Sequence, residues 1–256
     1  MRMAGLIIVF WLTTIAETMA NNCTGTLGTS RVLTVDAKAY PRVGLKSFAQ
    51  TLPLADKEVV LTFDDGPFPA TTSKILAALA HECVRATFFL IGRSAEANPQ
   101  IVKRIAEAGH SIGHHTWSHP ILSRISQAAA LKEIERGIDA DELALHATTK
   151  GDAAARFFRF PGFASTQPLL ETLKSRGIVV FGADLWASDW NVMSPQQELR
   201  LLTSRLDSAG KGIILLHDTK NQTANMLPAF LQYLRKNGYK VVHVEPAANI
   251  SASDEK

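Results

Sequence analysis

Short β-branched, aliphatic or aromatic runs alternate with longer helical patterns from residue 58 onward. Each run ends in Gly, Pro, Asp or His, and Gly109, Gly177 and Gly238 follow helical patterns as stop signals. This alternation is typical of repeated β-α units with a parallel sheet. The predicted strands span residues 58–63, 86–91, 111–115, 157–160, 178–183, 212–216 and 239–244.

Helical patterns fill the intervals between these runs, at residues 71–80, 94–108, 126–145, 167–176, 195–208 and 224–236. Seven strands alternating with helices predict an α/β fold that closes into a barrel. The main domain is expected over residues 58–248, after an extension over 21–57 that holds one further strand at 31–35. Residues 144–155 are expected to form a loop, and residues 249–256 a solvated tail.

The first twenty residues have the pattern of a secretory signal peptide. Arg2 precedes an apolar stretch from Ala4 to Leu12, and small residues lead to a cleavage site after Ala20, with Ala16 as the alternative. The apolar stretch is shorter than the ~20 residues that span a bilayer, so no stable membrane anchor is expected. The mature protein is therefore predicted to be exported, to the periplasm or outside the cell.

The composition is that of an ordinary globular protein, with 46% hydrophobic and 20% charged residues. The 27 basic and 24 acidic residues nearly balance, at a formal charge of +3, and no run of Lys or Arg occurs. Nucleic acid is therefore not an expected partner. Cys23 and Cys83 either pair in an oxidising compartment or remain as one exposed and one buried thiol.

Polar residues gather where five predicted strands end. Because β/α barrels assemble their active sites from the loops at the carboxyl ends of the strands, these residues are expected to share one face. They are Asp64 to Pro67, His114 to Pro120, Arg159 to Gly162, Asp184 to Trp190, and His217-Asp218.

His115 and His119 have a spacing that permits chelation of a metal ion. On a helical turn their side chains would lie ~5–6 Å apart, whereas in an extended strand they would lie ~13 Å apart. A shared site therefore requires the chain to leave the strand and coil around residues 116–118. The alternative is a surface pair of histidines with no metal.

Asp64 and Asp65 offer the carboxylate that would complete a His-His-carboxylate site of the kind that binds Zn²⁺. Neighbouring residues at a strand end point in different directions, so one aspartate could bind metal while the other faces water. Two adjacent carboxylates are costly to bury without a cation. The alternative is an Asp-capped turn punctuated by Gly66-Pro67.

Together these motifs resemble the polysaccharide deacetylases, the carbohydrate esterases of family 4 that share a homology domain with nodulation-type chitooligosaccharide deacetylases. The resemblance covers residues 58–245 and rests above all on TFDDGP at 62–67 and HTWSH at 115–119. It implies a distorted (β/α) barrel with fewer than eight strands. It also implies metal-dependent N-deacetylation of N-acetylglucosamine-containing glycans, of the chitooligosaccharide or peptidoglycan type, with release of acetate.

The resemblance also assigns residues to the metal and to the attack on the acetyl group. Asp65, His115 and His119 would bind a divalent metal, most often Zn²⁺, with Co²⁺ as another candidate. Asp64 would be the general base. Arg159 resembles the family arginine that pairs with this base, orienting it and favouring its charged form.

The remaining assignments concern the leaving group and the substrate. His217 matches the general acid that protonates the departing amine, and Asp189 its carboxylate partner. Trp190 and Leu215 resemble the apolar walls around the acetyl group and sugar ring, with simple core packing as the alternative.

The third motif departs from the usual Arg-x-Pro-Tyr-Gly of the family. Here Pro161 is followed by Gly162 and Phe163, so the tyrosine side chain is absent. The backbone N–H of Gly162 can still stabilise the oxyanion. His114 stays without an assigned role.

Two other functions remain open at the level of sequence. Metal-activated water also attacks esters, so an O-deacetylase of an acetylated polysaccharide such as xylan is the nearest enzymatic alternative. A non-catalytic glycan-binding protein on the same barrel would be favoured if Asp64, a metal ligand or His217 were replaced, yet all are present. An acetylated glycan is thus the expected partner, and no oligomeric state is predicted.

Overall fold

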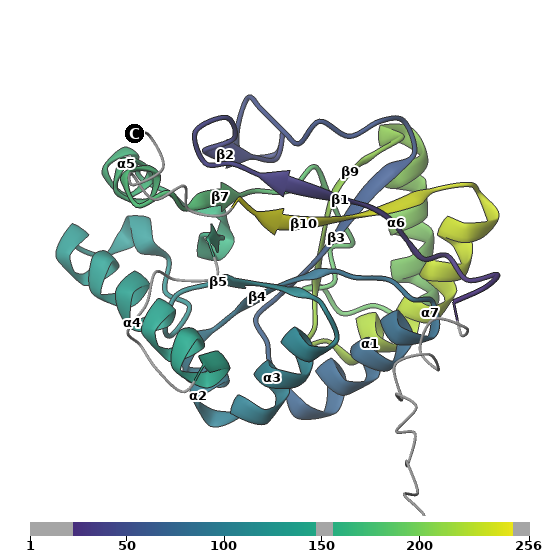
Figure 1. The fold of residues 1–256 in the computed structure, drawn as a ribbon, viewed down its shortest axis with the longest axis horizontal. Coiled ribbons are helices and arrows are strands. Elements are labelled where there is room, and N and C mark those ends of the chain that lie inside the picture. The colour runs from purple at the N-terminus through teal and green to yellow at the C-terminus, as the bar shows by residue number, and fades with distance from the viewer. Residues whose placement is uncertain (1–22, 147–155, 248–256) are drawn as a thin grey trace, which may run out of the picture.

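Ten strands form one sheet in the computed structural model, which describes residues 23–146 and 156–247 (Figure 1). Every strand pairing in it is parallel, in the order β1-β10-β3-β4-β5-β6-β7-β2, while β9 lies on the other edge of β3 and β8 beside β9. The strands are β1 Thr29–Val35, β2 Arg42–Val43, β3 Glu58–Asp64, β4 Thr87–Leu90, β5 Ser111–His114, β6 Phe157–Phe158, β7 Val179–Phe181, β8 Leu185–Trp186, β9 Gly212–His217 and β10 Lys240–Pro246.

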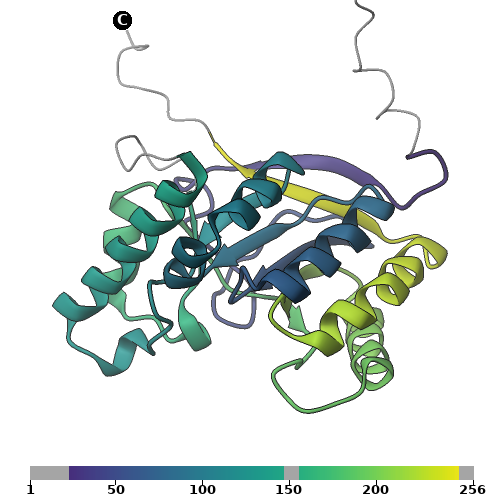
Figure 2. The ribbon, with the colours of Figure 1, turned by 90° about the horizontal axis from the view of Figure 1, so that it is seen from below.

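The helices surround this sheet on its outer side. Neighbouring helices contact one another in the order α6, α7, α1, α3, α4 and α5, and α2 packs on α3 and α4 (Figures 1 and 2). Their bounds are α1 Pro69–His81, α2 Gly92–Ala97, α3 Pro99–Glu107, α4 Gln127–His146, α5 Gln167–Ser175, α6 Pro195–Ala209 and α7 Asn221–Lys236.

The predicted α/β barrel is confirmed, in a distorted form. All seven predicted strands are present, as β3, β4, β5, β6, β7, β9 and β10, and β1 occupies the strand expected at residues 31–35. The barrel is not closed by hydrogen bonds, because among the described strands neither β7 nor β2 pairs with β8. The two-residue strands β2 and β8 were not predicted.

The helix expected over residues 94–108 is two helices. Pro99 starts α3, and Asn98 before it has φ −136° and ψ 51°, outside the helical region. A proline disfavours the helical conformation of the preceding residue, which explains the break between α2 and α3.

Alternation along β3 decides which side chains face the interior. All seven residues of β3 are buried, as expected for a parallel strand covered on both faces. Leu61 and Phe63 pack outward in the core beneath the helices, whereas Val60 packs inward with the aromatic core of Phe89, Phe157 and Phe181. Because side chains alternate, Thr62 and Asp64 share the inward face with Val60.

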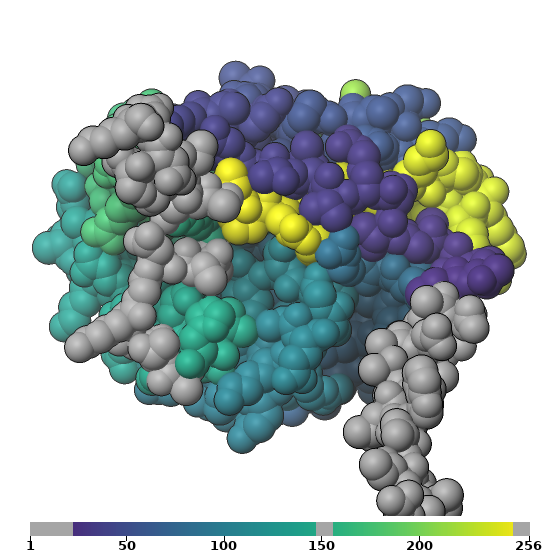
Figure 3. All heavy atoms as spheres, in the orientation of Figure 1, coloured from purple at the N-terminus to yellow at the C-terminus, as the bar shows by residue number. Residues whose placement is uncertain are grey.

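The described part of the N-terminal extension is tied to the main sheet. β1 pairs with β10, and Figure 3 shows the purple segment that contains β1 beside the yellow segment that contains β10. Cys23 and Cys83 form a disulfide with a Cα–Cα distance of 5.8 Å, which decides between the two states left open above.

Several expectations lie outside the described residues. They are the signal peptide over 1–20, the tail over 249–256 and most of the loop over 144–155. Among the residues that the structure does describe, no helix is both long and apolar enough to span a bilayer.

Candidate active site

Asp64 and Asp65 follow each other at the end of β3, and their carboxylates turn to different partners. Asp64 is buried and lies 2.6 Å from Arg159, whereas Asp65, at φ 77°, lies near two histidines. The next residue must be glycine, because a Cβ on Gly66 would collide with the carboxylate of Asp218. The sharp turn after β3 thus separates the two acids.

Asp65, His115 and His119 form a group that could hold a metal ion. Oδ1 of Asp65 lies 3.5 Å from Nε2 of His115 and 3.4 Å from Nε2 of His119. One ligand atom from each of the three residues lies within 4.8 Å of the others. The chain leaves β5 through left-handed residues at Thr116 (φ 68°) and His119 (φ 65°), so the expected turn brings the two imidazole centroids to 4.9 Å.

The chemistry of these three side chains fits a divalent cation. Nδ1 of His115 lies 2.7 Å from the carbonyl oxygen of Arg159, which can only accept, so the proton is on Nδ1 and Nε2 has a free lone pair. Burial lowers the pKa of His115 to about 3, which keeps the imidazole neutral. Oδ1 of Asp65 is buried and has no hydrogen-bond partner among the described residues.

Arg159 is fully buried in the barrel interior beside Asp64. Its Nη1 donates to Oδ1 of Asp64 at 2.6 Å and to Oγ1 of Thr62 at 2.8 Å, and its Nη2 donates to the carbonyl oxygen of Gly182 at 2.7 Å. The guanidinium lies 4.2 Å from the ring centroid of Phe89. Burial raises the pKa of Asp64 above its ordinary value, and the charge of Arg159 opposes this rise.

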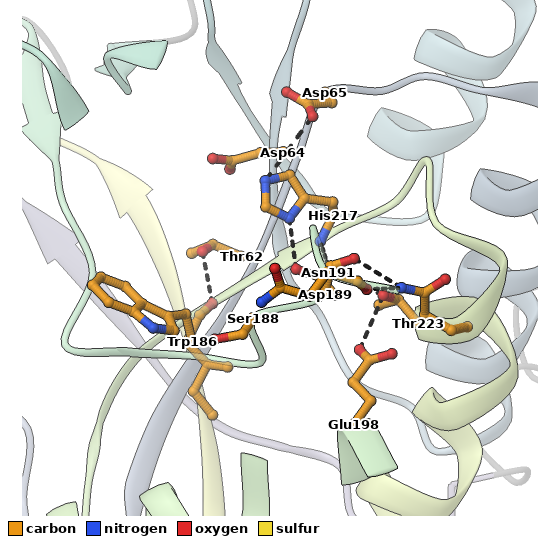
Figure 4. A network of polar contacts seen from close by, with 12 residues as sticks. Thr62, Asp64, Asp65, Trp186, Ser188, Asp189, Asn191, Glu198, His217 and Thr223 are labelled. Atoms are coloured by element: carbon orange, nitrogen blue, oxygen red, sulfur yellow. Dashed lines mark hydrogen bonds and ion pairs between the residues drawn. The ribbon is translucent and has the colours of Figure 1, made fainter. Parts of the chain in front are cut away.

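His217, at the end of β9, faces the same cluster. Its Nδ1 lies 2.8 Å from Oδ1 of Asp189, and its backbone N–H donates to Oδ2 of Asp189 at 2.7 Å (Figure 4). Its Nε2 points the other way and lies 4.0 Å from Asp65. Burial alone would lower the pKa of His217, but the hydrogen bond and charge of Asp189, together with Asp64 and Asp65, raise it to about 9.

Comparisons with known proteins agree with this geometry. The sequence profile of the polysaccharide deacetylases matches residues 52–181. The chain belongs to the polysaccharide deacetylase family. It is 33% identical over 202 residues to a peptidoglycan-N-acetylglucosamine deacetylase of Bacillus cereus, covering 75% of this chain and 89% of that protein.

Two further relatives are longer than this chain. Peptidoglycan-N-acetylmuramic acid deacetylase PdaC of Bacillus subtilis is 28% identical over 207 residues, covering 80% of this chain and 42% of that protein. The chain therefore spans less than half the length of PdaC. The solved structure of Bdellovibrio bacteriovorus peptidoglycan deacetylase Bd3279 aligns with a TM-score of 0.76 at 30% identity, covering 88% of this chain and 61% of that chain.

The residues expected to contact substrate lie in two places. Trp190 is 48% exposed, with its ring centroid 6.1 Å from that of His217, whereas Leu215 is buried in β9. Pro161 and Gly162 lie in the short 3₁₀ turn Pro161–Phe163, one residue beyond Arg159-Phe160, with Gly162 exposed and at φ 58°.

Aromatic side chains extend from Trp190 away from His217. The rings of Trp190 and Trp186 lie 5.8 Å apart, and those of Trp186 and Phe163 lie 6.1 Å apart and are stacked. Phe163, which stands where the usual motif has Gly, therefore joins this row.

His114, left without a role by the sequence, points away from the candidate metal group. Its Nδ1 lies 2.7 Å from Oδ2 of Asp141 on α4, and both side chains are buried. Because side chains alternate along β5, His114 contacts α4 while His115 faces the barrel interior.

Four polar residues near the site had no role assigned from the sequence, although Thr62 and Asp218 stood within the quoted motifs. Thr62 and Asp218 flank the two aspartates, while Thr223 and Glu198 lie beneath Asp189 on α7 and α6. The alternation of side chains along β3 could have predicted that Thr62 lies near the site, because it places Thr62 on the same face of the strand as Asp64. Glu198 and Thr223 have no such local signal, because only the packing of α6 on α7 brings them together.

Proposed function

We propose that this chain is a metal-dependent hydrolase that removes acetyl groups from the nitrogen of N-acetylglucosamine-containing glycans and releases acetate. The observation that carries the proposal is that Asp64 and Asp65, the two aspartates at the end of β3, have different partners. Arg159 holds Asp64, while His115 and His119 converge on Asp65. We therefore assign a base and a three-ligand cation site to neighbouring positions in this chain. Its membership of the polysaccharide deacetylase family supports this assignment.

Asp65, His115 and His119 would hold the divalent cation, for which we propose Zn²⁺, with Co²⁺ as a substitute. Two imidazoles and a carboxylate leave positions open for water and substrate. When bound there, such a cation lowers the pKa of water and polarises the acetyl carbonyl.

Asp64 would act as the general base. Nη1 of Arg159 donates to Oδ1 of Asp64 and to the hydroxyl of Thr62, which holds the guanidinium beside Asp64. Because Oδ1 already accepts this bond, Oδ2 is the oxygen that can take a proton. That oxygen lies 3.9 Å from Nε2 of His115, on the side of the candidate metal group. Asp64 would accept a proton from water as the water oxygen forms a bond to the acetyl carbon.

His217 would then supply the proton that the departing amine needs. Asp189 occupies its Nδ1, which leaves Nε2–H directed to the site. As the C–N bond breaks, the nitrogen takes this proton and leaves as a neutral amine, while the acetyl group leaves as acetate. The backbone N–H of Gly162, an exposed residue, would stabilise the oxyanion formed between these two steps.

The sugar ring would lie against Trp190, whose exposed ring stands beside His217. Relatives named for peptidoglycan support a peptidoglycan-type polymer, with chitooligosaccharides as the second candidate of the same chemistry. The Cys23–Cys83 disulfide supports a periplasmic or secreted location, because such bonds persist in oxidising compartments.

The deciding experiment measures acetate release from peptidoglycan, N-acetylated chitooligomers and acetylxylan, with and without a chelator. We expect release from the two N-acetylated polymers and none after chelation. Faster release from acetylxylan would identify an O-deacetylase instead. Binding to the glycans without acetate release would leave only a glycan-binding role.

A further inference from the structure

Four polar side chains form a hydrogen-bonded series that runs from the candidate active site into the protein. His217 contacts Asp189 at 2.8 Å, Thr223 lies 2.9 Å from Oδ2 of Asp189, and Oε1 of Glu198 lies 3.0 Å from the same Thr223 hydroxyl. Figure 4 shows the four in sequence, with Glu198 at the end remote from Asp65. Asp189, Glu198 and Thr223 are fully buried.

The number of available protons restricts the directions of the hydrogen bonds among these four side chains. Thr223 has one hydroxyl proton and lies between two carboxyl groups, so it can donate to only one of them. Asp189 already receives two N–H groups of His217. If both carboxyls were ionised, one would face the lone pairs of Thr223, so one carboxyl must bring a proton of its own.

Burial and charge identify Glu198 as the protonated group. Asp189 contacts the imidazole of His217, whose positive charge compensates a carboxylate. Among the described residues Glu198 forms no ion pair, and its Oε2 is buried with no hydrogen-bond partner. An unpaired buried carboxylate is far more costly than a neutral acid.

The groups around Glu198 act on its pKa in opposite directions. The first turn of α6, where Glu198 lies, favours an anion. Burial and the negative charge of Asp189 act the other way, and together they raise the pKa of Glu198 to about 7, although Thr223 and His217 oppose the rise. The position of the Thr223 hydroxyl between two carboxyl groups and the raised pKa of Glu198 therefore both indicate that Glu198 is the protonated group.

We propose that Glu198 and Thr223 are positioning residues for His217. Neutral Glu198 donates to Thr223, Thr223 donates to Oδ2 of Asp189, and the carboxylate so held fixes the imidazole through Nδ1. This inference rests on the proposed function for its effect on the reaction, since it needs His217 as the general acid. The protonation of Glu198 and the direction of the hydrogen bonds do not depend on that function.

The kinetic test compares Thr223→Val, Thr223→Ser and the control Thr203→Val, which changes a hydroxyl on α6 that bonds to the Leu199 carbonyl oxygen. We expect Thr223→Val to lower kcat on an N-acetylated chitooligomer on the order of 10-fold, less than the ~10²–10⁴-fold of a general acid. The KM and the rate on an activated aryl acetate should stay unchanged, because a phenolate leaves without protonation. Thr223→Ser should restore the amide rate, and Thr203→Val should leave both rates unchanged.

Equal losses on amide and ester, or no rescue by Thr223→Ser, would overturn the positioning role. Glu198→Gln keeps a donor toward Thr223 and should lose less amide activity than Glu198→Leu. Equal losses in these two variants would contradict donation by Glu198.

A spectroscopic test stands apart from activity. The infrared difference spectrum of the wild type against Glu198→Gln should contain the carbonyl stretch of a protonated carboxylic acid at about pH 6, which is below the raised pKa of Glu198 of about 7. Carboxylate bands in its place would overturn the inference even if deacetylation is confirmed. If no deacetylation is found, the infrared band still decides the protonation state of Glu198, so the two failures are distinguishable.

Discussion

The carbonyl oxygen of Arg159 accepts a hydrogen bond from Nδ1 of His115 at 2.7 Å, while the guanidinium of the same Arg159 binds Asp64. One residue thus orients a candidate metal ligand through its main chain and the candidate base through its side chain. The two functions can therefore be separated by substitution, because a change of side chain leaves the carbonyl in place.

Arg159→Lys should retain metal binding while lowering both stability and activity. A lysine cannot reproduce the bonds that Arg159 makes to Asp64, Thr62 and Gly182. Removing a partner from a buried ion pair costs about 3–5 kcal/mol, and this substitution should approach that range. Chemical denaturation and metal analysis of the same preparation would measure both effects, and parallel loss of metal would contradict the separation.

His115→Ala and His119→Ala should each weaken binding of Zn²⁺, and chelation of the wild type should abolish activity that added Zn²⁺ or Co²⁺ restores. Each variant removes one of three ligands, and the coordination left is too small for a stable site. Isothermal titration with Zn²⁺ provides the measurement. His81→Ala, at a side chain that is 84% exposed, is the matched control and should bind as the wild type does. Full turnover by a metal-free preparation would refute the site.

Asp64→Asn should keep the metal and lose most activity. An amide cannot accept the proton of the attacking water, and a general base contributes ~10²–10⁴-fold in rate. The exposed Asp139 on α4 supplies the control, as Asp139→Asn should change neither property. Loss of metal from Asp64→Asn would show that Asp64 and Asp65 have exchanged roles.

His217→Ala should reduce hydrolysis of an amide far more than hydrolysis of an activated aryl acetate, because only the amine must be protonated to leave. The acid acts while protonated, and the pKa of His217 is raised to about 9, so the rate should fall as the pH rises through about 9. Asp189→Asn removes the charge that favours the imidazolium and should move this alkaline limb to lower pH. Equal losses on amide and ester would reject the general-acid role.

Replacing the cystine by Cys23→Ser with Cys83→Ser should lower the free energy of unfolding by about 2–5 kcal/mol. The bond joins residues 60 apart in sequence, so its loss releases a large loop in the unfolded chain. Cys83 precedes β4, at the end of the barrel opposite the site, so kcat should not change. Thermal unfolding with and without reductant measures the effect, and unchanged unfolding on reduction would refute a stabilising bond.

The sequence by itself determined the seven main strands and most helices of this protein. Apolar runs that end in Gly, Pro, Asp or His are local signals, and they state where a strand ends and which residues follow it. Because parallel strands in a barrel place their carboxyl ends on one face, Asp64, Asp65, His115, Arg159 and His217 were predicted to meet there, and the structure brings them together. The break before α3 also had a local signal in Pro99.

Only the tertiary structure decided the contacts that join distant segments. β2 and β8 are two residues long, so they become strands by pairing with β7 and β9 and carry no period of their own. The pairing of Cys23 with Cys83 depends on where β1 docks. Likewise, Glu198 reaches Thr223 because α6 packs on α7, and a hydrogen bond between two helices depends on their relative placement, which no local pattern records.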